Sequence, residues 1–103
     1  MSEFTTVAKL EDVPENEPTA VESDGRKLVL IREDGEVHAL EDRCSHEDYP
    51  LHNGEVVDGQ IECALHGARF DLDSGDPKAL PAVKPVQRFE CRVEDDEIRV
   101  TLE

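Results

Sequence analysis

Apolar residues in this chain fall into short groups, and most of these groups alternate with polar residues. Alternation with a period of two places every second side chain on the same face, which is typical of strands buried on one side. No stretch of length shows the period of an amphipathic helix. Strands are expected around residues 4–9, 27–31, 37–40, 56–57, 61, 70–72, 89–93 and 98–102. The pattern therefore predicts an all-β fold.

Dipeptides that favour tight turns separate several of these strands. Asp34-Gly35 and Asp58-Gly59 are typical of two-residue hairpin loops, and Asp95-Asp96 precedes the last strand. Residues 11–18 form a polar, proline-bearing turn region. Because no repeat or long linker divides the chain, we expect a single domain over residues 1–103.

The size and composition of the chain limit the core that it can build. The chain has 103 residues, of which 37% are apolar and 4% aromatic. This is enough for one domain with a modest core, so a metal centre that cross-links two loops would add stability. No apolar run is long enough to span a bilayer, and the first residues contain no apolar signal core. We therefore expect a soluble, cytoplasmic protein without a membrane partner.

The chain is strongly acidic, with a formal net charge of −15. Such a charge disfavours nucleic acid and anionic membranes as partners. Two interpretations stay open. An acidic face could steer the protein toward a basic docking site, or the whole surface could be adapted to high salt. The low number of lysines and the dispersion of the acidic residues slightly favour the second.

The strongest chemical signal is a pair of mixed couplets, Cys44-Ser45-His46 and Cys63-Ala64-Leu65-His66. Each couplet offers one thiolate and one imidazole from a short loop, and the Asp58-Gly59 hairpin would bring the two loops side by side. Thiolates suit an iron–sulfur cluster, and imidazole raises the potential of the iron that it binds. A structural zinc ion is the alternative, but zinc fingers usually place both cysteines in one couplet and both histidines in the other.

Residues 44–75, CSHEDYPLHNGEVVDGQIECALHGARFDLDSG, resemble the cluster-binding region of the Rieske family. The resemblance implies a β-sandwich or barrel base of antiparallel strands with a small cluster-binding subdomain at about 43–70. It also implies one [2Fe-2S] cluster, with its metal ligands supplied by both couplets. In this arrangement Cys44 and Cys63 bind the inner iron, whereas His46 and His66 bind the outer iron.

Four positions depart from the high-potential members of this family. Respiratory Rieske proteins join the two loops by a disulfide, and the matching positions here are Tyr49 and Leu65. Those proteins also carry a serine and a tyrosine whose hydroxyls hydrogen-bond to the cluster sulfurs, where this chain has Ala68 and Phe70. Fewer donors stabilise the extra negative charge of the reduced cluster less. We therefore expect a potential toward the low end of the Rieske range, about −150 mV.

The resemblance implies an electron-transfer protein that has no active site of its own. We expect a monomeric ferredoxin that carries single electrons from a reductase to a terminal oxygenase, as in multicomponent aromatic-ring dioxygenases. Two alternatives stay open: a small Rieske-like subunit of an assimilatory nitrite reductase, and a zinc-stapled interaction module.

The third cysteine and the two remaining histidines are expected to have structural roles. Cys91 alternates with Phe89 and Val93, so it should point into the core as a free thiol. We expect His38 to be a solvated side chain and His52 to be exposed on the first ligand loop.

Four further residues near the couplets are candidates for supporting roles. Gly54 and Gly67 are expected to allow tight backbone turns beside the cluster. Pro81 resembles the proline of the loop that covers the cluster in this family. Arg69 is expected to pair with a neighbouring acidic residue.

Overall fold

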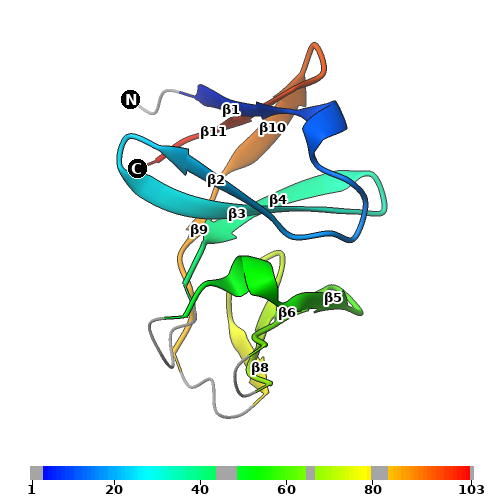
Figure 1. The fold of residues 1–103 in the computed structure, drawn as a ribbon, viewed down its shortest axis with the longest axis vertical. Helices are drawn as coiled ribbons and strands as arrows, with labels where there is room; N and C mark the ends of the chain where they lie inside the picture. Colours follow the sequence, from blue (N-terminus) through cyan, green and yellow to red (C-terminus); the bar gives the residue numbers. More distant parts are fainter. Residues whose placement is uncertain (1–3, 44–48, 65–66, 80–83, 103) are drawn as a thin grey trace.

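The computed structural model describes residues 4–43, 49–64, 67–79 and 84–102. Within these ranges it contains eleven strands and two short 3₁₀ helices, η1 (Leu10–Asp12) and η2 (Leu51–Asn53) (Figure 1). The strands form three antiparallel sheets in the described part of the chain. The all-β prediction is confirmed. None of the described helices is long and apolar enough to cross a membrane.

The three sheets are built from strands that are mostly neighbours in sequence. The first sheet has the order β1 (Thr5–Lys9), β11 (Glu97–Val100), β10 (Cys91–Glu94). The second sheet has the order β2 (Thr19–Ser23), β3 (Arg26–Glu33), β4 (Glu36–Glu41), β9 (Arg88–Phe89). The third sheet has the order β5 (Glu55–Val57), β6 (Gln60–Glu62), β7 (Arg69–Asp71), β8 (Pro77–Ala79).

Strand β3 lies in the middle of the molecule and is buried on both faces. Leu28 and Leu30 belong to a core cluster that the second sheet shares with the first. Val29 and Ile31 belong to another cluster, which the second sheet shares with the third. Because both faces are covered, β3 is continuously apolar instead of alternating. Figure 1 accordingly shows the second sheet between the first sheet and the third.

Four hairpins turn on two-residue loops that begin with aspartate. Both central residues have positive φ, between 48° and 80°, in Asp24-Gly25, Asp34-Gly35, Asp58-Gly59 and Asp95-Asp96. This geometry matches the right-handed twist of the flanking strands. The turns predicted at Asp34-Gly35, Asp58-Gly59 and Asp95-Asp96 are confirmed.

The strand predicted at residues 89–93 is two strands in two different sheets. β9 pairs with β4, whereas β10 pairs with β11, and the chain changes sheet at Glu90. Phe89 and Cys91 nevertheless pack in the same core cluster. The apolar alternation therefore continues across the sheet change and hides it.

The third sheet carries the loop between β6 and β7, which begins at Cys63, and follows directly on η2. It continues through β8 to Ala79 and packs its apolar face on Val29 and Ile31 of β3. A cluster-binding subdomain at about 43–70 stays a prediction.

Candidate metal centre

The second couplet begins in the hairpin loop between β6 and β7. Glu62 and Arg69 form the last register pair before the loop. The amide of Cys63 donates to the carbonyl of Ala68 at 2.7 Å, and the amide of Gly67 donates to the carbonyl of Cys63 at 3.0 Å. Gly67 has a φ of 76°, which favours glycine even though the space around it is open. The tight turn predicted at Gly67 is therefore confirmed.

The side chain of Cys63 is buried where this loop meets the core. It is 2% exposed and belongs to the same core cluster as Ala68 and Phe70. Solvent access is one of the factors that set the reduction potential of an iron–sulfur cluster. A thiolate that apolar neighbours shield from water is therefore suited to bind iron in such a cluster. Cys63 therefore fits the inner-iron ligand that the sequence predicts.

The other three predicted ligands, Cys44, His46 and His66, lie outside the described residues, as do Leu65 and Pro81. The four-ligand set and the covering role of Pro81 stay predictions.

The first ligand loop returns to the third sheet through η2. Leu51 is fully buried in the core cluster that contains Cys63, and Tyr49 packs against this cluster. The amide of Gly54 donates to the carbonyl of Leu51 at 2.9 Å and closes the turn. The packing contact of Tyr49 thus anchors this end of the loop to the core.

Asp42 and His52 join the two ends of the first loop. Asp42 directly follows β4, and its side chain is only 4% exposed. The backbone N–H of His52 donates to Oδ1 of Asp42 at 2.8 Å, and Nδ1 of His52 lies 2.6 Å from Oδ2. The side chain of His52 is 37% exposed, as predicted, but a buried carboxylate holds one edge of its ring, a contact that the sequence does not reveal.

Gly54 lies where η2 meets the end of β6. Its φ of −88° is open to any residue, but a Cβ at this position would overlap the carbonyl oxygen of Glu62. Gly54 therefore permits a close approach of two backbones instead of a left-handed turn. Since Glu62 directly precedes Cys63, this contact brings the return of the first loop against the start of the second.

We expect Gly54→Ala to lower the free energy of unfolding by about 1–3 kcal/mol, because the added methyl group must displace the β6 backbone. The visible absorbance of a cluster bound at Cys63 should fall as well, because Cys63 directly follows the displaced strand. Urea unfolding and absorbance of the purified protein measure the two effects. Gly35→Ala is the matched control: its surroundings are open, so only the strain of its positive φ, about 1 kcal/mol, is expected. Equal effects of the two substitutions would contradict the close-approach role of Gly54.

Arg69 pairs with Glu62 across the stem of the second loop, as predicted. Its Nε donates to Oε2 of Glu62 at 2.8 Å. Both side chains are partly exposed, so water screens the pair and its contribution to stability is at most about 1 kcal/mol.

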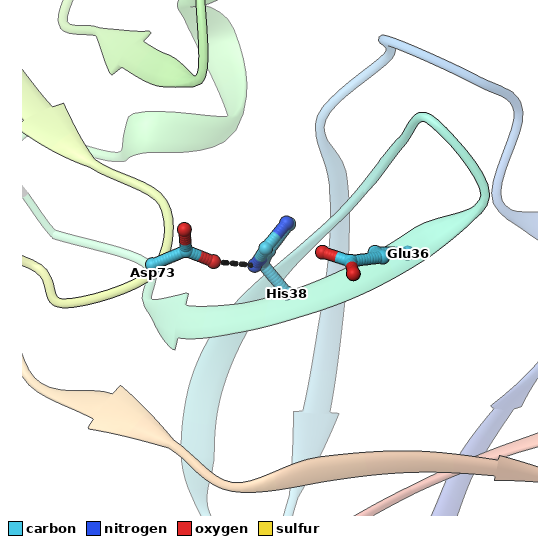
Figure 2. A group of neighbouring side chains, drawn as sticks. All are labelled: Glu36, His38 and Asp73. Carbon is cyan, nitrogen blue, oxygen red and sulfur yellow. Dashed lines mark ion pairs between the residues drawn. The ribbon is translucent and has the colours of Figure 1, made fainter.

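A second group of ligand-type side chains lies between β4 and the turn after β7 (Figure 2). Possible ligand atoms of Glu36, His38 and Asp73 all lie within 4.8 Å of one another. Arg88 and Arg92 line the same hollow, and their positive charges oppose the binding of a cation there. We therefore interpret the group as an ion pair, with Nδ1 of His38 3.4 Å from Oδ1 of Asp73.

The prediction that His38 is solvated is wrong. Its side chain is only 12% exposed and lies in a hollow that Arg88 and Arg92 also line, with Asp73 of the turn after β7 beside its ring (Figure 2). These neighbours are distant in sequence, so the local pattern does not reveal the burial.

Cys91 is a free thiol that packs against the core between the first and second sheets, as predicted. Burial raises the pKa of the Cys91 thiol to about 11, and the positive charge of Arg88 acts in the opposite direction. Since the thiolate is the reactive form, this environment keeps Cys91 unreactive at neutral pH.

We expect iodoacetamide to modify Cys91 about 100-fold more slowly at pH 8 than an unperturbed thiol, because the thiolate fraction is that much smaller. The rate should rise as the pH approaches about 11. A pKa raised in the folded state contributes stability below the unfolded pKa, and this contribution is lost as the pH rises through the folded value. Mass spectrometry measures the rate, with Cys91→Ser identifying the modified site. Modification as fast as that of free cysteine at pH 8 would contradict the buried thiol.

The described residues form a small β domain in which a hairpin loop carries the buried thiol of Cys63. The family model of the Rieske [2Fe-2S] domain matches residues 3–90. This chain therefore belongs to the Rieske [2Fe-2S] family, and its cofactor is an iron–sulfur cluster.

Relatives of similar length support the same assignment. The ferredoxin component of biphenyl 2,3-dioxygenase from Rhodococcus jostii is 34% identical over 100 residues, which cover 97% of this chain and 94% of the relative. The ferredoxin of carbazole 1,9a-dioxygenase from Nocardioides aromaticivorans has a TM-score of 0.93 at 35% identity, with 97% of this chain and 98% of that chain covered.

A second similar structure comes from a complex of an oxygenase with a ferredoxin. A chain in the complex of reduced oxygenase and oxidised ferredoxin of carbazole 1,9a-dioxygenase has a TM-score of 0.90 at 29% identity. The match covers 97% of this chain and 94% of that chain.

Proposed function

We propose that this protein is a Rieske-type ferredoxin that carries single electrons from a reductase to a terminal oxygenase. The observation that carries this proposal is the likeness to dioxygenase ferredoxin components over nearly the whole of both chains. A chain that matches these ferredoxin components along nearly their whole length is expected to have their role.

The proposed cofactor is one [2Fe-2S] cluster held by Cys44, His46, Cys63 and His66. When bound, such a cluster takes up and releases one electron at a time. The buried thiol of Cys63 supports this donor set, since it lies on a loop held by two backbone hydrogen bonds. A rigid loop limits reorganisation of the ligand when the charge of the centre changes.

The surroundings of Cys63 support a low potential. Ala68 and Phe70 are fully buried in the same core cluster, and neither carries a hydroxyl group. The chain thus offers the negative charge of a reduced centre fewer hydrogen-bond donors than its respiratory relatives do. A low potential suits a carrier that must reduce an oxygenase.

The formal charge of −15 supports transient docking to a basic surface on the partner. Stopped-flow mixing of the reduced protein with its oxidised terminal oxygenase tests this role. We expect a second-order electron transfer whose rate falls as salt is raised through the physiological range. If the rate instead persists in molar salt, the acidity is better explained as adaptation of the whole surface.

Two results would contradict the proposed function itself. A stable, stoichiometric complex with a large sirohaem-containing subunit would support the nitrite reductase subunit instead. A colourless protein that contains zinc but no iron or acid-labile sulfide would support the interaction module. Metal analysis and size-exclusion chromatography of the purified protein distinguish these outcomes from the expected monomeric iron–sulfur protein.

A further inference from the structure

We propose that Asp42 and His52 form a clamp that closes the base of the first ligand loop and so positions Cys44 and His46 for the cluster. The proposal rests on the proposed function, because it concerns how the same cluster is held. Asp42 precedes Cys44 by two residues, and His52 follows His46 by six. In this role both are positioning residues that act through the loop between them.

The Asp42 side of the clamp is fixed to the second sheet. The backbone N–H of Asp42 donates to the carbonyl of Lys27 at 3.0 Å, directly beyond the last register pair of β3 and β4. Its carboxylate is almost completely buried, and both oxygens face His52. The acceptor is therefore held in one place before the loop begins.

The His52 side is fixed to the core. His52 lies in η2 between Leu51, which is fully buried, and the turn closed by the amide of Gly54. Its backbone N–H and its ring nitrogen reach the same carboxylate, so the contact restrains both the main chain and the side chain. Two bonds to one buried group define the position of the loop end more closely than one bond would.

Burial makes this contact costly to break. A carboxylate removed from water is destabilising unless hydrogen bonds compensate for the lost hydration. In the closed arrangement the contacts with the backbone N–H and the ring nitrogen of His52 replace the hydration that the Asp42 carboxylate has lost. The closed arrangement is therefore favoured even though the His52 side chain is 37% exposed.

The two ligand loops are closed in different ways. The second loop belongs to a hairpin, where the Cys63 and Ala68 backbones pair directly. The ends of the first loop come from β4 and η2, which are not paired strands, and the carboxylate of Asp42 joins them. The clamp thus holds the two ends of the first loop together, as the backbone hydrogen bonds between β6 and β7 hold the ends of the second loop.

Substitution of the clamp tests this role through retention of the cluster. His52→Leu keeps the bulk of the side chain but removes its ring nitrogen, and Asp42→Ala removes both acceptors. We expect both variants to lose the visible absorbance of the holo-protein about 10- to 100-fold faster than the wild type in the presence of an iron chelator. His52→Asn places an amide nitrogen close to the position of Nδ1 and should restore a rate near that of the wild type.

Matched controls separate positioning from general stability. Glu94→Gln removes the negative charge from the exposed Arg92–Glu94 pair on β10, and Ile98→Val weakens the core beside the first sheet, remote from both ligand loops. Neither should accelerate loss of the cluster. Should Asp42→Ala fail to fold, His52→Leu carries the test alone, since its side chain is partly exposed.

Two further readouts are the g-values of the EPR signal and the hydrogen-exchange rate of the backbone amide of residue 52. We expect both to change in His52→Leu and to return toward the wild type in His52→Asn. Loss of the cluster at the wild-type rate in His52→Leu, or equal acceleration in Ile98→Val, would overturn the clamp. A wild-type protein that binds no iron–sulfur cluster would instead contradict the proposed function.

Discussion

Replacing His66 by serine should abolish the EPR signal of a histidine-ligated cluster. Serine cannot supply the neutral nitrogen that gives a Rieske centre its characteristic signal, and the hairpin loop offers no second imidazole in its place. We expect essentially complete loss of this signal in the dithionite-reduced protein, with the visible bands lost or shifted.

The same substitution should leave the β fold in place. Backbone hydrogen bonds between Cys63, Gly67 and Ala68 hold the loop. Far-ultraviolet circular dichroism checks this point. His38→Gln is the matched control, since His38 lies on β4 beside Asp73 and should not affect the signal. An EPR spectrum in His66→Ser that equals that of the wild type would refute the ligand assignment.

Introducing the two missing hydroxyls, by Ala68→Ser with Phe70→Tyr, should raise the midpoint potential by about 50–100 mV. Each hydrogen bond to a charged acceptor contributes on the order of 1 kcal/mol, and for a one-electron couple about 59 mV corresponds to a tenfold change in the equilibrium constant. Both residues are fully buried in the cluster of side chains that contains Cys63, so new hydroxyls there are shielded from water.

Phe89→Tyr is the matched control for this prediction. Phe89 is also buried, but it belongs to the core cluster between the first and second sheets. Its hydroxyl should leave the potential unchanged. Redox titration of the three proteins measures the shift. No rise in the double variant, or an equal rise in Phe89→Tyr, would contradict the view that missing donors keep the potential low.

Two predicted strands show why apolar patterns are informative. β3 is recognised because four consecutive apolar residues are buried, and β11 because its apolar residues alternate. β2 and β8 are missed, because Thr19–Ser23 and Pro77–Ala79 contain few apolar side chains. Their positions depend on pairing with β3 and β7, which is a long-range property.

The candidate site shows the same division between local and long-range information. The chemistry of Cys63 and the tight turn at Gly67 are encoded within a few residues, so the motif predicts them. The roles of Asp42 and His38 are not, because each depends on burial by a segment that is distant in sequence. Before burial is known, Asp42 is one of 26 acidic residues and carries no local signal that distinguishes it from the others.

The strand predicted across residues 89–93 gives a further example. Its alternation is correct for the burial of Phe89 and Cys91, but Val93 is exposed, and the pairing changes from one sheet to another at Glu90. A pattern of apolar positions reports which side chains are buried. It does not report which strand lies beside them.

An EPR-monitored redox titration of the purified protein tests the central claim most directly. A Rieske ferredoxin should show a histidine-ligated [2Fe-2S] signal that appears on one-electron reduction, with a midpoint potential near the low end of the family range, about −150 mV. A strongly positive midpoint would contradict the low-potential assignment. The absence of any signal from a protein that contains zinc would contradict the ferredoxin itself.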